Sequence, residues 1–311
     1  MPPAETENAS LLRALLQWAA CRIGPMGTLL GALEAGGTKF RPAVVDADTF
    51  EIVAQAWVPT TTPDETLGAC IDFFSGHDIK ALGVASFGPL IVDRTSANYG
   101  AIAATPKPGW SHVPLLTTLV DALSVPADIQ TDVEAAAVAE WKQGAGQGHS
   151  RVGYVTVGTG IGAALAIDGV PFRGRNHTEL GHIPVTRVDG DDFSGNCPFH
   201  GDCLEGMASG PALEDRWGVD PATLDGRDDV WDLEAAYLAQ LVRVYALSFS
   251  PDIVLFGGGV GTRPDMAERI AKASEADLAG YAVDGPPIVA TAGLGADAGV
   301  IGAALLAQSL C

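Results

Sequence analysis

Four side chains that bind zinc well lie between residues 182 and 203 of this chain. Cys197, His200 and Cys203 are separated by two residues each, and His182 lies upstream. Two thiolates and two imidazoles make a complete tetrahedral zinc site, which has no open position for water. We therefore expect a structural Zn²⁺ here. Because Glu179 precedes His182 by three residues, the metal would also fix where that carboxylate points.

Three other interpretations of these residues remain open. Cys197 and Cys203 could form a disulfide or be buried thiols, and His182 could be an ordinary core residue. Zinc could also perform the chemistry, although four protein ligands argue against a catalytic ion. Gly195 and Gly201 favour the tight loop that a shared metal requires.

Glycines gather at three places where a strand-like segment ends. The turns read Gly36-Gly37-Thr38-Lys39, Gly158-Thr159-Gly160 and Gly257-Gly258-Gly259. Backbone without side chains lets N–H groups, and at the first turn a threonine and a lysine, approach the phosphates of a ligand. The plain alternative is a β-hairpin whose turn needs positive φ. The turns match neither the dinucleotide fingerprint nor the P-loop pattern.

Asp132 stands where a strand-like segment ending at Thr131 meets an alanine-rich helix. A carboxylate at the carboxyl end of a sheet strand is where α/β proteins place catalytic groups. Thr131 and Glu134 also fit a capping box, in which they would only close the start of the helix. The residues by themselves leave both roles open.

The composition limits the kinds of partner that we expect for this protein. Lys and Arg number 18 against 38 acidic residues, and the resulting formal charge of −20 repels nucleic acids and anionic membranes, so we expect neither as a partner. An anionic ligand would need local donors such as backbone N–H groups or Mg²⁺. The five cysteines form only one tight cluster and no export signal is evident, which favours a reducing cytoplasm.

Strand and helix patterns place these groups in two lobes. The turns at residues 36–37 and 158–160 each join two strand-like segments, one pair in each half of the chain, which suggests related lobes facing each other across a cleft. The expected strands are 28–34, 40–45, 81–87, 154–157, 163–167 and 253–256, and the expected helices are 133–141, 230–248, 264–279 and 300–310. Residues 1–25 read as an N-terminal extension with a short amphipathic helix.

A stiff loop lies between the first two glycine turns. It reads Thr105-Pro106-Lys107-Pro108-Gly109-Trp110, with two prolines around the lysine. The tryptophan either fills a gap in the core or shapes a sugar pocket, and the sequence does not decide between them.

Together these motifs resemble the ROK family (repressors, open reading frames, kinases), and within it the zinc-containing bacterial fructokinases. The resemblance runs from about Met26 to the C-terminus. Besides the turns, the stiff loop and the Cys-His-Cys loop, it rests on Glu34-Ala35 before the first turn, Ser86-Phe87-Gly88-Pro89, Thr131-Asp132-Val133 and Glu179-Leu180-Gly181-His182.

The resemblance implies an α/β fold of the actin-like, ribonuclease-H-like type, with two lobes around a cleft. The small lobe would comprise residues 26–131 with the C-terminal helix 297–311. The large lobe would comprise 132–296 and carry the zinc loop 182–203. Relatives are usually homodimers, so a homodimer is expected.

The implied activity is transfer of phosphate from ATP to fructose in the presence of Mg²⁺. Asp132 would be the general base, and an ordinary pKa near 3.9 would keep it ionised at neutral pH. The resemblance further implies that the turns at 36–39 and 158–160 face the ATP phosphates and that 257–259 lies by the nucleoside. The implied sugar contacts are Lys107, Gly109, Asp132, Glu179 and His182.

Two alternatives to this activity remain. One is a kinase for another hexose, mannose or glucose; the other is a sugar-sensing protein without catalysis, since the family includes repressors. Residues 1–25 are too few and too acidic for a helix-turn-helix domain. One position departs from the common pattern, because Glu134 stands where relatives often have Asn. We expect this change to alter helix capping more than catalysis.

Overall fold

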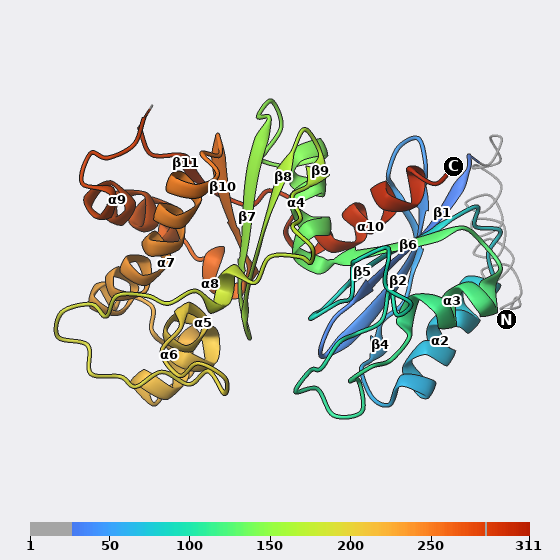
Figure 1. Cartoon of the computed structure of the whole chain (residues 1–311), viewed down its shortest axis with the longest axis horizontal. Helices are drawn as coiled ribbons and strands as arrows, with labels where there is room; N and C mark the ends of the chain where they lie inside the picture. The colour runs from blue at the N-terminus through green and yellow to red at the C-terminus, as the bar shows by residue number, and fades with distance from the viewer. Residues whose placement is uncertain (1–26, 284) are drawn as a thin grey trace, which may run out of the picture.

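Two β-sheets organise the part of the chain that the computed structural model describes, residues 27–283 and 285–311 (Figure 1). The sheets belong to two lobes that lie side by side, joined through helices α4 (Asp132–Gln143) and α10 (Ala298–Gln308). The predicted extension, residues 1–25, lies outside the described residues. Within the described residues, no helix combines the length and apolar character needed to cross a membrane.

The first sheet builds the small lobe. Its strand order is β3-β2-β1-β5-β6, with β4 paired to β2; β1 runs antiparallel to β2 and parallel to β5. The strands are β1 (Leu29–Ala35), β2 (Lys39–Asp46), β3 (Ile52–Gln55), β4 (Val58–Pro59), β5 (Leu82–Ser86) and β6 (Ala127–Thr131). Helices α2 (Pro63–Ser75) and α3 (Leu115–Leu123) share a core with this sheet.

The two faces of the small-lobe sheet are covered by different helices because side chains alternate along a strand. Leu33 packs with α2 and α3, whereas its neighbour Ala32 packs with α10 from the end of the chain. At Gly83 a side chain would overlap the carbonyl oxygen of Ala303, so the C-terminal helix lies directly on the strand backbone. The C-terminal helix therefore returns to the first sheet.

The second sheet builds the large lobe, in the order β11-β10-β7-β8-β9. Its strands are β7 (Arg151–Val157), β8 (Ile161–Ile167), β9 (Val170–Pro171), β10 (Ile253–Gly257) and β11 (Ile288–Thr291). The helices that follow β9 are η1 (Leu180–His182), α5 (Leu204–Ala208), α6 (Gly210–Trp217), η2 (Pro221–Thr223), α7 (Asp228–Ser248), α8 (Gly258–Gly261), α9 (Met266–Leu278) and η3 (Gly295–Asp297). One core joins α4 to β7 and β8, and another joins α5, α7 and α9 to the sheet.

The predicted elements are found within a few residues of their expected bounds. Both glycine hairpins form, as β1–β2 and β7–β8, and all four predicted helices are present. Trp110 is fully buried against Phe40 and Phe87, so it fills the small-lobe core. The proposed division of the chain at residues 131 and 132 stays a prediction.

Candidate functional site

A cavity of about 340 Å³ lies between the two sheets and receives side chains from both. Glu34 reaches it from the end of β1, and Asp132 reaches it from the first residue of α4. The remaining lining residues come from α4, β7, α8, η3 and α10: Val133, Ala136, Tyr154, Thr156, Gly258, Gly259, Thr262, Gly295, Ala296, Ala298 and Gly299. The cavity thus unites groups that are far apart in the sequence.

Helix N-termini converge on this cavity. The long helices α4 and α10 begin at Asp132 and Ala298, both of which line it, and the short helix α8 begins there at Gly258. Free N–H groups at a helix N-terminus carry partial positive charge and favour phosphate. At α4 the Val133 and Glu134 N–H groups already donate to Asp132 and Thr131, so the local donors that an anionic ligand needs on so acidic a chain would come from α8 and α10. Gly258 has φ +78°, and a side chain there would overlap the carbonyl oxygen of Val157.

Asp132 is free to do chemistry because other residues cap its helix. Thr131 accepts a hydrogen bond from the Glu134 N–H, and Glu134 accepts one from the Thr131 N–H, which confirms the capping box. Oδ1 of Asp132 accepts the N–H of Val133, at 2.9 Å. Burial raises the pKa of Asp132 to about 6, above the ordinary value that we expected. A base with a pKa near the working pH is well suited to accept a proton.

Glu34 is a site residue that the sequence analysis quoted without giving it a role. Burial raises its pKa to about 7, and the negative charge of Asp132 adds to the effect. Among the described residues no hydrogen bond to its carboxylate is found, although it lines the cavity. The sequence feature that could have indicated this role is an acidic residue at the end of a buried strand, two positions before a glycine turn. Carboxylate oxygen of this kind is the ligand that Mg²⁺ prefers.

The first glycine turn is fixed by hydrogen bonds among residues that do not line the cavity. The Gly36 N–H donates to the Lys39 carbonyl oxygen, and Thr60 Oγ1 donates to the Gly36 carbonyl oxygen at 2.8 Å. Gly37 faces open space. The Lys39 ammonium lies over the ring of Trp57, 4.1 Å from its centroid. The predicted contacts of residues 36–39 with ATP, including those of Thr38, therefore stay a prediction.

The second glycine turn is coupled to helix α5. Gly158 donates to the Gly160 carbonyl oxygen, and Gly210 donates to the Gly158 carbonyl oxygen at 2.8 Å. Glu205, the second residue of α5, accepts the N–H of Ile161 at 2.9 Å. Thr159 stands at the tip of this hairpin, between β7 and β8. The third turn, Gly257 to Gly259, ends β10 and begins α8, and it places its last two residues in the cavity.

The four predicted metal ligands are brought together. Their ligand atoms all lie within 4.8 Å of one another, in a group made of His182, Cys197, His200 and Cys203. His182 Nδ1 is 3.7 Å from Cys197 Sγ and 3.5 Å from Cys203 Sγ. A zinc tetrahedron with ordinary bond lengths has edges of about 3.6 Å. The cysteines are free thiols, so the disulfide alternative is wrong.

His182 connects this cluster to a second acidic residue that the sequence analysis missed. Its Nδ1 faces the two sulfurs, and its Nε2 is 3.9 Å from Oε1 of Glu205. Glu205 therefore lies between the cluster and the Gly158–Gly160 hairpin. The available signal was a carboxylate two residues after Cys203.

Three other predicted sugar contacts lie outside the cavity lining. Glu179 stands before η1 with its side chain 52% exposed, and its charge raises the pKa of Asp132. Lys107 and Gly109 lie in the small-lobe loop, where Gly109 has φ +81°. Their contact with a sugar stays a prediction.

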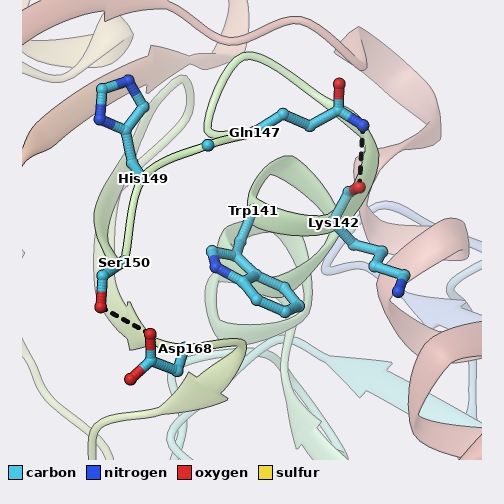
Figure 2. A pocket seen from close by; sticks show the side chains of 7 residues that line it. Trp141, Lys142, Gln147, His149, Ser150 and Asp168 are labelled. Atoms are coloured by element: carbon cyan, nitrogen blue, oxygen red, sulfur yellow. Dashed lines mark hydrogen bonds between the residues drawn. The ribbon is translucent and has the colours of Figure 1, made fainter.

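A larger hollow of about 500 Å³ lies elsewhere, on the large lobe at the ends of α4 and β8 (Figure 2). Trp141, Lys142 and His149 line it, and Ser150 Oγ donates to Asp168 across its edge. It contains none of the predicted site residues. We therefore take the smaller cavity between the sheets as the candidate site.

Comparisons with known proteins agree on the class of the molecule. The ROK family model matches residues 30–310. The chain is 41% identical to a putative fructokinase from Bacillus subtilis over 90% of its length and 95% of that protein's. It is 40% identical to a fructokinase from Pediococcus pentosaceus, with coverage of 90% and 98%. A ROK hexokinase from Thermus thermophilus superposes with a TM-score of 0.75 at 28% identity, covering 91% of this chain and 98% of that one.

Proposed function

Because the chain belongs to the ROK family, we propose that it is a fructokinase, which transfers the γ-phosphoryl group of ATP to fructose. Its fold is the actin-like arrangement of two lobes around a cleft that ROK sugar kinases share. The observation that carries the proposal is Asp132, a carboxylate with a raised pKa at a cavity where helix N-termini meet.

Asp132 acts as the general base. A sugar hydroxyl is a weak nucleophile, so it must be held in line with the γ-phosphorus and lose its proton as the new bond forms. With a pKa of about 6, Asp132 is ionised in most molecules at neutral pH and still basic enough to accept that proton. The capping box takes up the N–H groups of Thr131 and Glu134, so these two groups do not compete for the Asp132 carboxylate.

The phosphates of ATP are substrate groups that we assign to the glycine turns and helix N-termini. Residues 158–160 and 257–259 are proposed to contact ATP through backbone N–H groups, and residues 36–39 to contact it from the small lobe. Glu34, which lines the cavity without a hydrogen-bond partner among the described residues, would hold Mg²⁺ together with the phosphates. That ion neutralises phosphate charge when it is bound.

Zn²⁺ is proposed as a structural ion of the loop 182–203. The close fit of four soft or borderline ligands supports it, and no ligand position is left for water. Metal bound at His182 Nδ1 leaves the Nε2–H as the donor of that ring, which faces Glu205 and is available to a sugar hydroxyl. We propose that His182 and Glu179 contact the acceptor sugar from this loop, and that Lys107 and Gly109 contact it from the small lobe.

A coupled ADP-release assay with purified protein, ATP and Mg²⁺ tests the function. Fructose should be turned over with a higher kcat/KM than mannose or glucose, and the product should be fructose 6-phosphate. Absence of ADP release above the sugar-free rate, or a higher kcat/KM for another hexose, would refute the assignment.

The homodimer also remains a proposal. Ile167, Val170 and Phe172 expose apolar surface at the edge of the second sheet, where Phe172 lies 5.3 Å from the ring of Phe249. A second copy that covers this edge would remove the apolar side chains from water. Light scattering after size exclusion should give twice the chain mass, and Val170→Asp should shift it toward the monomer.

A further inference from the structure

The segment from Arg173 to Glu179 connects β9 to η1. At its start, Arg173 makes two hydrogen bonds of 2.7 Å to the carboxylate of Glu134 in α4. Near its end, Thr178 Oγ1 donates to the Ala163 carbonyl oxygen in β8 at 2.9 Å. The segment is therefore anchored to the large lobe at both ends.

His177 ties this segment to the other lobe. Its Nε2 accepts the backbone N–H of Leu90 at 3.0 Å, and Leu90 belongs to the small-lobe core. The ring also lies against Gly88, where a Cβ would be 3.6 Å from the imidazole Cε1. Only 7% of the His177 side chain is exposed. This hydrogen bond joins groups 87 positions apart in the sequence, across the cleft.

The Leu90 contact determines which nitrogen of His177 carries the proton. Because Nε2 accepts a hydrogen bond, the neutral ring is protonated on Nδ1. That nitrogen is 3.5 Å from Oε1 of Glu179 and 3.3 Å from the Thr178 carbonyl oxygen. The ring thus presents an acceptor to the small lobe and a donor to a proposed sugar contact.

Glu179, which His177 contacts, is also within electrostatic reach of the base. The charge of Glu179 raises the pKa of Asp132. A group that moved Glu179 would therefore change the sugar site and the surroundings of the base together. His177 is the side chain that holds Glu179 on one side and the small lobe on the other.

We propose that His177 is a positioning residue for the acceptor sugar, a role that rests on the proposed function. Its imidazole joins the lobes through the Leu90 N–H and orients the Glu179 carboxylate toward the sugar. ATP is contacted elsewhere, by the glycine turns and helix N-termini. Loss of the imidazole therefore weakens fructose binding far more than ATP binding.

The test compares His177→Ala and His177→Gln with the wild-type enzyme, with His149→Ala as the matched control. His149 lines the outer hollow (Figure 2), which shares no lining residue with the cavity between the sheets. His177→Ala should raise the KM for fructose at least tenfold and change the KM for ATP less than twofold. His177→Gln should recover most of the loss because its amide oxygen can accept the Leu90 N–H.

A second measurement asks whether His177 acts through Glu179. Glu179→Gln and His177→Ala should each raise the fructose KM, and the double variant should be little worse than the poorer single variant. Calorimetric binding of fructose without ATP should follow the same order. Multiplicative effects in the double variant would overturn the proposal.

Other outcomes of these experiments would also refute the proposed role of His177 or the proposed function. A fructose KM for His177→Ala within twofold of wild type overturns the role of His177, and so does an equal rise in both KM values. If His177→Ala does not fold, His177→Gln is compared with His177→Asn, because asparagine is too short to reach Leu90. A folded His177→Gln whose fructose KM is no lower than that of His177→Asn then overturns the role of His177. Absence of wild-type turnover with fructose instead refutes the proposed function on which this role rests.

Discussion

Replacing Asp132 by asparagine should abolish phosphoryl transfer and, at pH 8, make the protein more stable. Asparagine keeps an oxygen that can accept the Val133 N–H, and the capping box of Thr131 and Glu134 is untouched. The substitution therefore removes a charge and a base without removing a structural contact. Turnover should fall by orders of magnitude because the asparagine amide cannot accept the sugar proton.

The gain in stability follows from the raised pKa. The folded protein holds the Asp132 proton more tightly than the unfolded chain does, with a pKa of about 6 against 3.8. The stabilisation of the folded protein by the proton bound to Asp132 is fully present below pH 3.8 and is lost as the pH rises through about 6. Two pH units correspond to about 3 kcal/mol. Because Asp132 lines a cavity and part of the residue is exposed, we expect a gain of about 1–3 kcal/mol at pH 8 and about half of that at pH 5.

Urea unfolding at the two pH values measures this difference. Asp121→Asn is the control, because Asp121 is exposed on α3 and makes no hydrogen bond or ion pair among the described residues. The control should retain activity and show no pH-dependent gain. The reasoning would be refuted if Asp132→Asn were less stable than wild type at pH 8, or if its advantage did not grow between pH 5 and pH 8.

Four further predictions concern pH, metal, glycine and the buried ion pair. Fructose turnover should fall about tenfold per pH unit below about pH 6, where Asp132 is protonated, and an acid limb near pH 4 would contradict the raised pKa. The purified protein should contain one zinc per chain by atomic emission, and chelation or Cys203→Ser should lower the unfolding temperature and raise the fructose KM; unchanged values would reject a structural metal. Gly258→Ala should cost at least about 1–2 kcal/mol and raise the ATP KM, because φ is +78° and its Cβ overlaps backbone; a fully stable variant with normal ATP KM would argue against this geometry. Glu134→Asn should lose the paired hydrogen bonds to Arg173 and about 1–3 kcal/mol of stability, with the preference for fructose intact, and altered sugar selectivity would show that Glu134 acts in catalysis.

The local features of the site followed from the sequence. The spacing of Cys197, His200 and Cys203 predicted a four-ligand cluster, and its atoms are within reach of one ion. The Thr131 and Glu134 pair predicted a capping box, which is present. The capping box and three of the four metal ligands depend on residues a few positions apart, whose separation is limited by the length of the backbone between them. The pattern of strands around the glycine turns was predictable for the same reason.

The groups that the sequence analysis missed depend on distant parts of the chain. Glu34 acquires its raised pKa because it is buried in a cavity that it shares with Asp132 of α4. His177 acquires a partner only when the small lobe brings Leu90 to it. No residue close to Glu34 or His177 in the sequence indicates either contact.

The sequence alone thus determined the family, the turns, the helix cap and the metal-ligand set, because each depends on backbone conformation and short spacing. The tertiary structure decided which carboxylates share a cavity, how far burial raises the pKa of Asp132, and which imidazole joins the lobes. Desolvation and cleft contacts arise only when elements far apart in the chain pack together, so they have no local signature.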